Sequence, residues 1–428
     1  MMSLLVVAAI VVAVALGYKT KINIGLFAIA FAYLIGAFGM GLSPSEIIAM
    51  WPLKIFFVIF SVCLFYSFAT VNGTLEKLAE HLIYHCRSVP QLLPFAVFFT
   101  ATVISAMGAG YYTVLAFMAP ITLLLCERTG MSLIAGGMAV NYGALSGANF
   151  VSSQSGIIFR GLMVNAGITE NEAFINTAGI FVSTLVISVL VFLTGHGKAM
   201  KASVFAATPP TPLNREQRMT LWLTLAMMAI VLAAPIAYLM LPDNPTARLV
   251  NSKMDIGLIA SLFSVIALLL KLGDERKAMA SVPWATLIMI CGVGMLISVA
   301  IKAGTIDILA SWMGNSIPPI LVPLVFGIVA AFMSLFSSTL GVVTPALFPM
   351  VPPIASALGL DPLILFVAIV VGSQATSISP FSSGGSLILG SCPTEQSRTV
   401  LFPQLLFRAA PLGFVAALIF NVLLTILY

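Results

Sequence analysis

The sequence has very few charged residues. Only 8% of its 428 residues are Asp, Glu, Lys or Arg, whereas 60% are hydrophobic. Soluble domains carry roughly 25% charged residues, so the composition excludes a soluble globular protein and predicts an integral membrane protein. Histidine occurs three times, and the five cysteines lack the paired spacing of a metal site or a disulfide framework. The net charge of +5 is interpreted as loop charge on one side of a membrane, not as nucleic-acid binding.

Two further absences narrow the class of membrane protein. The chain has no alternating polar and apolar segments, which argues against an outer-membrane barrel. Residues 3–17 lack both the basic start and the small-residue cleavage site of a signal peptide, so this segment is expected to be the first transmembrane helix. Apolar stretches of about 20 residues follow along the whole chain, each long enough to cross a bilayer as a helix.

The second half of the chain repeats landmarks of the first half at an offset of about 231 residues. The pairs include Lys21 with Lys253, Pro52 with Pro283, Gly73 with Gly304, Gly110 with Gly341, Phe150 with Phe381 and Ser155 with Ser386. A long apolar chain with such a repeat predicts a secondary transporter whose site lies between the two halves at mid-membrane. The expected division is a first repeat at 1–197, a cytoplasmic linker at 198–218 and a second repeat at 219–428.

Each half is expected to cross the membrane five times and to carry one re-entrant hairpin. The predicted spans are 3–17, 22–42, 52–72, the hairpin 89–127, the broken segment 131–165, and 173–194, followed by 219–241, 254–272, 283–301, the hairpin 318–358, the broken segment 362–392, and 409–428. This topology places only Lys54, Arg160, Arg248, Lys253 and Lys302 on one side, against the other fourteen Lys and Arg residues. Such a bias fits the positive-inside rule. Because five is an odd number, the two repeats are expected to lie inverted in the membrane. With the basic side cytoplasmic, both termini are expected to be extracytoplasmic.

Four polar clusters interrupt the apolar segments. Two occupy the predicted hairpin tips, at 105–113 and 336–344, and two interrupt the long segments, at 141–156 and 372–386, where Pro380 breaks the helix. Unwound backbone within a membrane is tolerated only where it is buried in protein or lines a cavity, and a helix that starts at a tip presents free N–H groups to an anion. A packing seam of small residues between ordinary helices is the alternative for each tip.

The chain resembles the ion-transporter superfamily of divalent-anion and dicarboxylate carriers, and its first half resembles the malonate/dicarboxylate carrier family. The resemblance rests on the segments 22–26, 69–74 and 104–110. It implies a homodimer in which a mobile part of each protomer carries the site across the membrane in an elevator motion. At the second tip Ser338 replaces the asparagine of the family's Ser-Asn-Thr signature, and the first tip, Ala106-Met107-Gly108, departs from it.

We therefore expect an all-α polytopic membrane protein, located in the plasma (bacterial inner) membrane, that transports a small dicarboxylate such as malonate or a C4 acid. The alternatives are another anion (citrate, sulfate or an acidic amino-acid derivative) and, less favoured, an anion channel or an intramembrane enzyme. No Asp, Glu or His lies near the middle of a predicted span, which leaves an enzyme without a nucleophile–base pair or metal ligands.

Hydroxyl and amide side chains in the four clusters are the candidate ligands. The expected substrate contacts are Ser105, Asn149, Ser152, Ser338, Thr339 and Ser379, and the expected ion contacts are Asn141, Ser337, Thr376 and Ser377. Such oxygens, together with main-chain carbonyls, suit sodium as coupling ion, although a proton gradient stays open. No organic cofactor is expected, and the expected partners are the substrate, the bilayer and a second copy of the chain.

Overall fold

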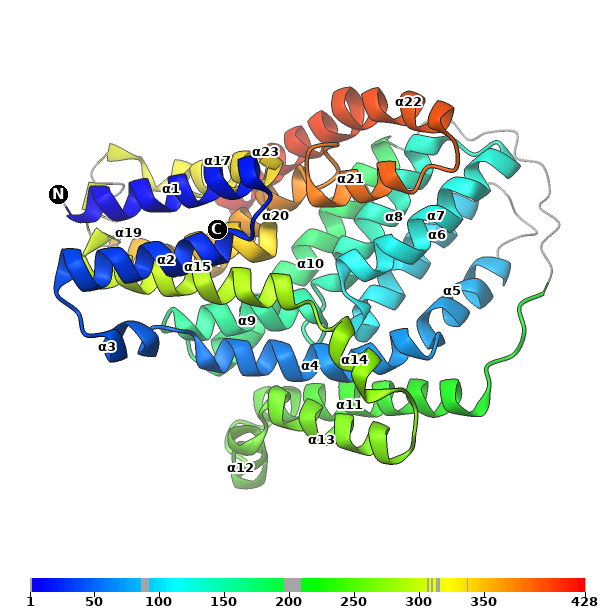
Figure 1. Cartoon of the computed structure of the whole chain (residues 1–428), viewed down its shortest axis with the longest axis horizontal. Helices are drawn as coiled ribbons and strands as arrows, with labels where there is room; N and C mark the ends of the chain where they lie inside the picture. The colour runs from blue at the N-terminus through cyan, green and yellow to red at the C-terminus, as the bar shows by residue number, and fades with distance from the viewer. Residues whose placement is uncertain are drawn as a thin grey trace.

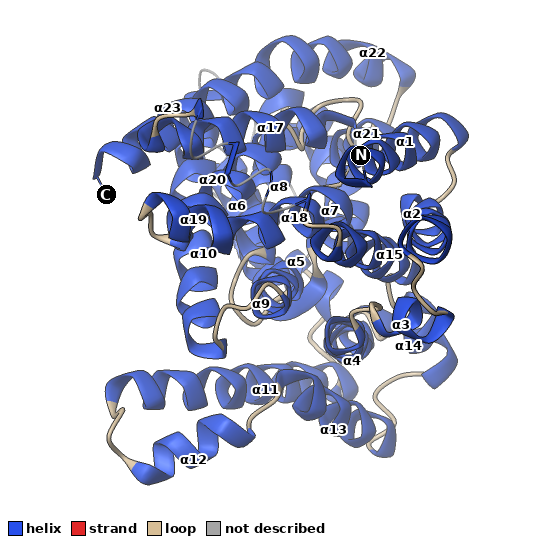
Figure 2. Cartoon of the chain, turned by 90° about the vertical axis from the view of Figure 1, so that its left-hand side faces the viewer, coloured by secondary structure: helices blue, strands red, loops and turns tan. Residues whose placement is uncertain are grey.

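The computed structural model describes residues 2–85, 92–195, 209–305, 308, 311–312, 316–336 and 338–427. Within these ranges the chain forms helices joined by short loops and contains no strand (Figures 1 and 2). Ser337 and residues 198–208 of the predicted linker lie outside the described residues. The predicted all-α class is confirmed.

The helices of the first part follow the predicted apolar segments. They are α1 (Met2–Thr20), α2 (Ile24–Tyr33), π-helical η1 (Leu34–Gly39), α3 (Pro44–Ala49), α4 (Leu53–Val71), α5 (Thr74–His85), α6 (Leu93–Ile104), π-helical η3 (Ser105–Ala109), α7 (Tyr111–Thr129), α8 (Leu133–Ala148), α9 (Gln154–Asn165) and α10 (Glu170–Gly195).

The second part repeats this order of long, broken and hairpin helices. Its elements are α11 (Arg215–Met240), α12 (Pro245–Lys253), α13 (Ile256–Leu269), α14 (Glu275–Ser281), α15 (Trp284–Lys302), η4 (Pro319–Leu321), α17 (Val322–Phe336), π-helical η5 (Thr339–Val343), α18 (Thr344–Leu347), η6 (Phe348–Met350), α19 (Val351–Leu358), α20 (Pro362–Ala375), α21 (Ser383–Gly390), α22 (Glu395–Gln404), η7 (Leu405–Ala409) and α23 (Ala410–Leu427).

Many of these helices suit a lipid environment. Seven in the described residues are long and apolar enough to cross a membrane, or eight if the bent pair α12 and α13 forms one span, and shorter apolar helices lie among them. Outward-facing positions on the peripheral helices carry large apolar side chains, such as Leu190, Trp222, Leu262 and Leu423. Apolar side chains on the outside cost nothing when the solvent is hydrocarbon. The chain is an integral membrane protein.

The two predicted hairpins open toward opposite ends of the molecule. In Figure 1, α6 begins and α7 ends on the right, whereas α17 begins and α19 ends on the left, and both turns lie near the centre. The broken segments α8–α9 and α20–α21 also have their interruptions near the centre (Figure 1). Four irregular stretches of chain therefore meet at mid-molecule.

Residues paired by the sequence repeat occupy matching places. Asn23 caps α2 by accepting a hydrogen bond from the Gly25 N–H, and Asp255 caps α13 by accepting one from the Leu258 N–H. Pro52 and Pro283 immediately precede α4 and α15. These local choices follow from helix-end chemistry, since a side-chain oxygen satisfies an N–H that the first turn leaves unpaired.

Glycines bring the first arm of each hairpin into direct contact with the neighbouring broken helix. A Cβ at Gly143 of α8 would lie 2.4 Å from the Phe98 carbonyl oxygen of α6, and one at Gly147 would lie 2.0 Å from that of Thr102. In the second half, a Cβ at Gly372 of α20 would lie 2.2 Å from the carbonyl oxygen of Gly327 on α17. Backbone packs against backbone there, as small-residue seams allow in membranes.

Several helices were not predicted. The short helices α3, α5, α12 and α14 connect or flank the spans, α22 continues through η7 into α23, and α11 begins at Arg215 instead of 219. These segments carry polar residues that do not fit a membrane-crossing pattern. α5, for example, contains Glu76, Lys77, Glu80 and His81 on a helix of 12 residues.

Candidate functional site

The first hairpin turn is built on two glycines. The π-helical segment η3 contains Gly108 at φ +99°, and Gly110 at φ +75° precedes α7. These values lie in a region that only glycine adopts at low cost. A Cβ at Gly108 would lie 2.3 Å from the Tyr66 ring, and one at Gly110 would lie 1.8 Å from Gln154 Oε1. The turn is therefore fitted closely against α4 and α9.

The second hairpin turn uses a hydroxyl cap. Ser338 precedes η5 in extended conformation, and its Oγ accepts a hydrogen bond from the Gly341 N–H over 3.3 Å. Thr344 Oγ1 donates to the Thr339 carbonyl over 3.1 Å, and Thr339 Oγ1 lies 3.3 Å from Ser334 Oγ of α17. The polar groups of this turn are thus largely paired within the hairpin.

Serine side chains also satisfy the unwound backbone in the two broken helices. Between α8 and α9, Ser153 Oγ donates to the Gly147 carbonyl over 3.0 Å. Between α20 and α21, Ser382 Oγ donates to the Ser379 carbonyl over 2.8 Å and accepts from the Gly385 N–H over 3.2 Å. Buried backbone groups need such partners, and these hydroxyls explain why the interruptions are rich in serine.

A reciprocal amide pair joins the two interruptions. Asn149 Nδ2 donates to Gln374 Oε1 over 2.8 Å, and Gln374 Nε2 donates to Asn149 Oδ1 over 2.9 Å. Asn149 Nδ2 also donates to Thr184 Oγ1 of α10 over 3.0 Å. Asn149 is fully buried and Gln374 nearly so, so each amide depends on the other for its hydrogen bonds.

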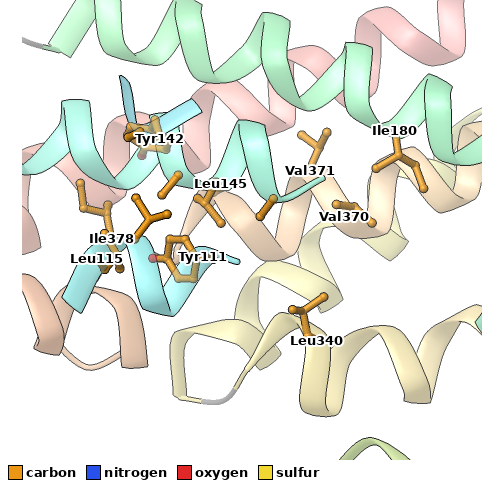
Figure 3. Packing of buried hydrophobic residues seen from close by; sticks show 14 of the residues in the cluster. Tyr111, Leu115, Tyr142, Leu145, Ile180, Leu340, Val370, Val371 and Ile378 are labelled. Carbon is orange, nitrogen blue, oxygen red and sulfur yellow. The ribbon is translucent and has the colours of Figure 1, made fainter. Parts of the chain in front are cut away.

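Two tyrosines at the start of α7 extend this network to both hairpins. Tyr111 Oη donates to Asn141 Oδ1 over 2.6 Å, and Asn141 Nδ2 donates to Ser377 Oγ over 3.4 Å. Tyr112 Oη lies 3.4 Å from Ser338 Oγ of the second turn. Apolar side chains, including Leu145, enclose the Tyr111 ring (Figure 3). Both hairpins and both broken helices are thereby connected by polar contacts.

A small cavity of about 30 Å³ lies inside this network. Its walls come from both hairpins and both broken helices. The lining residues are Tyr111, Tyr112, Leu145, Ser155, Ser334, Thr339, Leu340, Gln374, Ser377, Ser382, Ser383 and Gly384. The volume suffices for a water molecule or two, since a single water needs roughly 10–15 Å³ by this measure. The cavity as it stands is too small for an organic ligand.

Four helical N-termini border the cavity. Its walls include first-turn residues of α7 (Tyr111, Tyr112), of α9 (Ser155), of η5 (Thr339, Leu340) and of α21 (Ser383, Gly384). No side chain caps α7 or α9, whereas Ser338 and Ser382 cap the other two. A helix N-terminus carries roughly half a positive charge where its N–H groups are free. The described residues of the cavity wall include no cationic side chain, so these N–H groups are the nearest positive groups in the wall.

The predicted ligands lie at different distances from this cavity. Thr339 and Ser377 line it, while Asn141, Asn149 and Ser338 each lie one hydrogen bond from a lining residue. Ser379 and Thr376 are buried in the second interruption, where Ser379 Oγ accepts from the Phe381 N–H and Thr376 Oγ1 donates to the Ala331 carbonyl of α17.

Ser105 and Ser152 are buried in the first hairpin turn and the first interruption. Their hydroxyl oxygens have no hydrogen-bond partner among the described residues. They do not line the small cavity, so the structure separates them from the group around Tyr111.

Sequence reasoning missed several lining residues: Tyr111 and Tyr112 of α7, Ser155 of α9, Gln374 of α20, and Ser382 and Ser383 at the start of α21. All lie within the four polar clusters. For all but Gln374 the available signal is a position immediately after a break, where a new helix begins, whereas Gln374 lies in the last turn before one.

Comparisons with known proteins agree with this architecture. Residues 1–148 match the family model described as dicarboxylate carrier protein MatC N-terminus. The YdaH transporter of Alcanivorax borkumensis is similar in structure, with a TM-score of 0.58 and 16% identity over 89% of this chain and 86% of that one. MtrF of Neisseria gonorrhoeae is similar, with a TM-score of 0.58 and 15% identity over 89% and 82%.

No curated protein matches the sequence. The resemblance inferred from the sequence is confirmed by the family match, which indicates a carrier and not an enzyme. Residues 1–148 are thus similar to the N-terminus of the MatC dicarboxylate carrier protein, and the chain as a whole has the fold of the two transporter structures.

Proposed function

We propose that this protein is a secondary transporter that binds a small dicarboxylate, such as malonate or a C4 acid, at the central cavity. The observation that carries the proposal is the meeting of four helical N-termini around that cavity. Two carboxylates require about two positive charges, and four N-termini supply roughly half a charge each. The family match over residues 1–148 supports a dicarboxylate as the cargo.

Transport through this site requires a change of conformation. A cavity of about 30 Å³ is too small for malonate, so the hairpins and broken helices must separate or move together to admit it. We propose an elevator motion in which the hairpins and broken helices carry the site. The glycine contacts between α6 and α8 and between α17 and α20 support movement as one body.

Sodium is the coupling ion that the local chemistry favours in this proposal. The residues lining the cavity include no Asp, Glu or His among those described, so a carboxylate proton relay has no candidate there. The C-terminal ends of α8 and α20 bring main-chain carbonyls to the interruptions, and Ser105 and Ser152 add unpartnered buried hydroxyls. Hard cations prefer such oxygen ligands.

The topology is proposed as two inverted repeats, 1–197 and 219–428, joined by a cytoplasmic linker at 198–218, with both termini extracytoplasmic. The opposite opening of the hairpins supports the inversion (Figure 1). The test is labelling of a single added cysteine in intact cells with a membrane-impermeant maleimide. Ser252→Cys on α12 should react from outside, whereas Lys277→Cys on α14 should react only after lysis. The reverse result would contradict the orientation.

The decisive experiment is uptake of radiolabelled malonate and succinate into proteoliposomes under a sodium gradient, a proton gradient or neither. Sodium-dependent uptake would support both cargo and coupling ion. Uptake driven by protons alone would overturn the sodium assignment, and no uptake of either acid would overturn the cargo assignment. Crosslinking in the same vesicles tests the proposed homodimer.

Export is the second candidate direction. MtrF, which shares the fold, is described as one of a class of antimetabolite efflux pumps. Loading the vesicles with labelled acid and following its loss under the same gradients distinguishes export from uptake.

A further inference from the structure

A second and larger cavity lies away from the central site. Its volume is about 270 Å³, and its walls come from α4, α9, the start of α10 and the junction of α12 with α13. None of its lining residues lines the central cavity. Apolar side chains such as Ile55 and Val164 form much of the wall, and the charged lining residues are Lys54, Arg160, Glu170 and Asp255.

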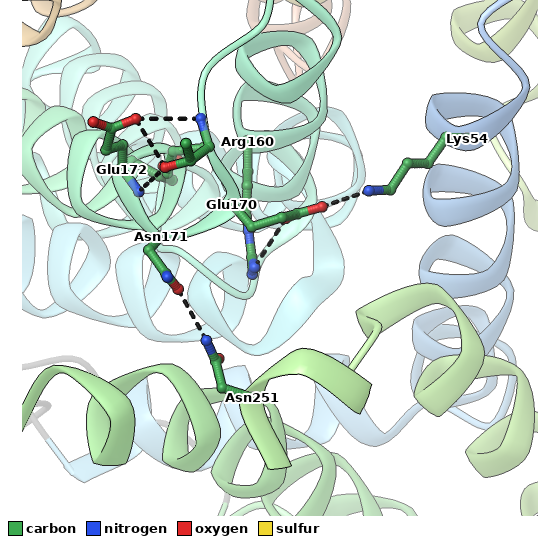
Figure 4. Close-up of polar contacts among 9 residues, drawn as sticks. Lys54, Arg160, Glu170, Asn171, Glu172 and Asn251 are labelled. Carbon is green, nitrogen blue, oxygen red and sulfur yellow. Dashed lines mark hydrogen bonds and ion pairs between the residues drawn. The ribbon is translucent and has the colours of Figure 1, made fainter. Parts of the chain in front are cut away.

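One carboxylate bridges two cations at this cavity. Glu170 Oε1 lies 2.5 Å from Lys54 Nζ, and Glu170 Oε2 lies 3.2 Å from an Arg160 guanidinium nitrogen (Figure 4). Lys54 belongs to α4, Arg160 to α9 and Glu170 to α10. Asp255 is engaged elsewhere, because its Oδ1 accepts the Leu258 N–H at the start of α13. Lys54 and Arg160 carry two positive charges against the single charge of Glu170, and Asp255 supplies the second negative charge of the cavity lining.

Arg160 retains unused donors. Its Nε is buried and has no hydrogen-bond partner among the described residues, while its guanidinium carbon lies 5.8 Å from the centre of the Phe174 ring. Its side chain is 19% exposed, compared with 61% for Lys54. A guanidinium binds a carboxylate best through two parallel N–H donors, and Glu170 occupies only one of its terminal nitrogens.

The same helix connects the two cavities. α9 contributes Ser155 to the central cavity and Ile157, Arg160 and Gly161 to the larger one. Arg160 follows Ser155 by five positions, which is about 8 Å along the helix axis at 1.5 Å per residue. An anion bound at Arg160 would thus lie within two helical turns of the N-terminus of α9.

We propose that this larger cavity is a second anion site, which binds a small carboxylate between Lys54 and Arg160 in place of the Glu170 carboxylate. Glu170 occupies the position of the ligand and competes with it. The ligand's carbon chain lies against the apolar wall of α4 and α9, and its carboxylate pairs with Lys54 and with Arg160, whose Nε donor Glu170 does not engage. The choice of a carboxylate as the ligand rests on the proposed function. The cavity and its charged side chains are observed independently of that proposal.

The test is equilibrium binding of radiolabelled succinate to the purified full-length protein in detergent without added lipid. We expect two sites per protomer. Glu170→Gln removes the competing carboxylate and should tighten one of them about fivefold to tenfold, whereas Lys54→Gln should weaken the same site at least tenfold. A purely structural ion pair predicts no gain of affinity from Glu170→Gln.

Lys302→Gln is the matched control. Lys302 pairs with Glu46 over 3.1 Å and is similarly exposed, but it does not line the cavity. It should leave both sites unchanged. Equal effects of Lys54→Gln and Lys302→Gln, or unchanged binding in Glu170→Gln, would overturn the proposal. Lys54→Arg, which retains the cation, should bind like the wild type, and a loss of binding there would also contradict it.

Adding Gln374→Leu to each variant disrupts the central site, so that binding at the larger cavity can be measured by itself. Residual succinate binding that still responds to Glu170→Gln supports the second site, even if the wild type transports no dicarboxylate. If the wild type transports dicarboxylate but succinate binding does not change in Glu170→Gln, the second site alone is overturned. Loss of the residual binding on addition of anionic lipid vesicles would show that a lipid headgroup occupies the cavity and would overturn the free acid as ligand.

Discussion

Tyr111 donates a hydrogen bond to Asn141 over 2.6 Å, whereas the neighbouring Tyr142, equally buried, has no partner for its hydroxyl among the described residues. The first hydroxyl orders the amide that faces Ser377 in the other half of the chain. Two tyrosines of similar burial thus offer a direct comparison between a hydroxyl that positions the site and one that does not.

Tyr111→Phe should reduce transport, because Asn141 loses a donor worth about 1 kcal/mol, or roughly fivefold in an equilibrium constant. Concentration-dependent uptake into proteoliposomes measures this as a raised KM. Tyr142→Phe removes an unpaired hydroxyl and should leave uptake unchanged. Equal losses in the two variants would contradict the positioning role of Tyr111.

The amide pair of Asn149 and Gln374 should behave as one unit. Asn149→Ala or Gln374→Ala leaves the other amide buried and partly unpaired, at a cost of about 1–3 kcal/mol. The double variant should cost less than the two single losses combined, because no orphaned amide remains. Thermal unfolding in detergent provides the measurement. Additive losses would show that the pair is not coupled.

Gly108→Ala should disrupt the first hairpin turn. The variant combines an unfavourable φ of +99° with a Cβ that would lie 2.3 Å from ring atoms of the buried Tyr66. Gly167→Ala is the control, since Gly167 has φ +95° but nothing within 4 Å of its Cβ position, and should cost only about 1–2 kcal/mol of backbone strain. Size-exclusion profiles of fluorescent fusions compare the two. Monodisperse Gly108→Ala protein would disprove the close fit.

Glu76→Gln should stabilise the protein at neutral pH. Burial on α5, outside the spanning helices, raises the pKa of Glu76, an effect that nearby Glu80 reinforces and the residue's own backbone N–H opposes. An acid whose folded pKa is raised loses stability as pH rises from its unfolded value, near 4.3, through the raised one. The gain in melting temperature should therefore vanish below about pH 4. Glu80→Gln, which breaks a 2.9 Å ion pair with Lys77, should give no gain at neutral pH.

The sequence locates many of the apolar helices, because hydrocarbon thickness constrains the length of an apolar segment strongly. The expected span 52–72 is α4 at Leu53–Val71, and the expected break near Pro380 lies between α20 and α21. The short flanking helices escape this reasoning, since α5 and α12 are too polar and too short to register as spans.

The site was harder to predict than the spans. Gln374 is one of many polar residues in the cluster 372–386, and its role depends on Asn149, 225 residues away. Tyr111 gives no signal by itself, because a tyrosine in an apolar helix fits a lipid interface as well as a polar cluster. Repeat matching located the four clusters but not which side chains face one another, since that depends on the crossing of the hairpins.

The glycine seams between the hairpin arms and the broken helices limit how this molecule can deform. Where Gly143 and Gly147 meet α6, and Gly372 meets α17, the nearest atoms are main-chain carbonyl oxygens, which cannot change rotamer to absorb a shift. Rotation of either helix about its own axis would bring Cβ atoms into the opposing main chain. Each seam therefore behaves as a rigid rod of two helices, and bending is left to the connecting loops, where single substitutions would alter the rate of the cycle without touching the affinity for cargo.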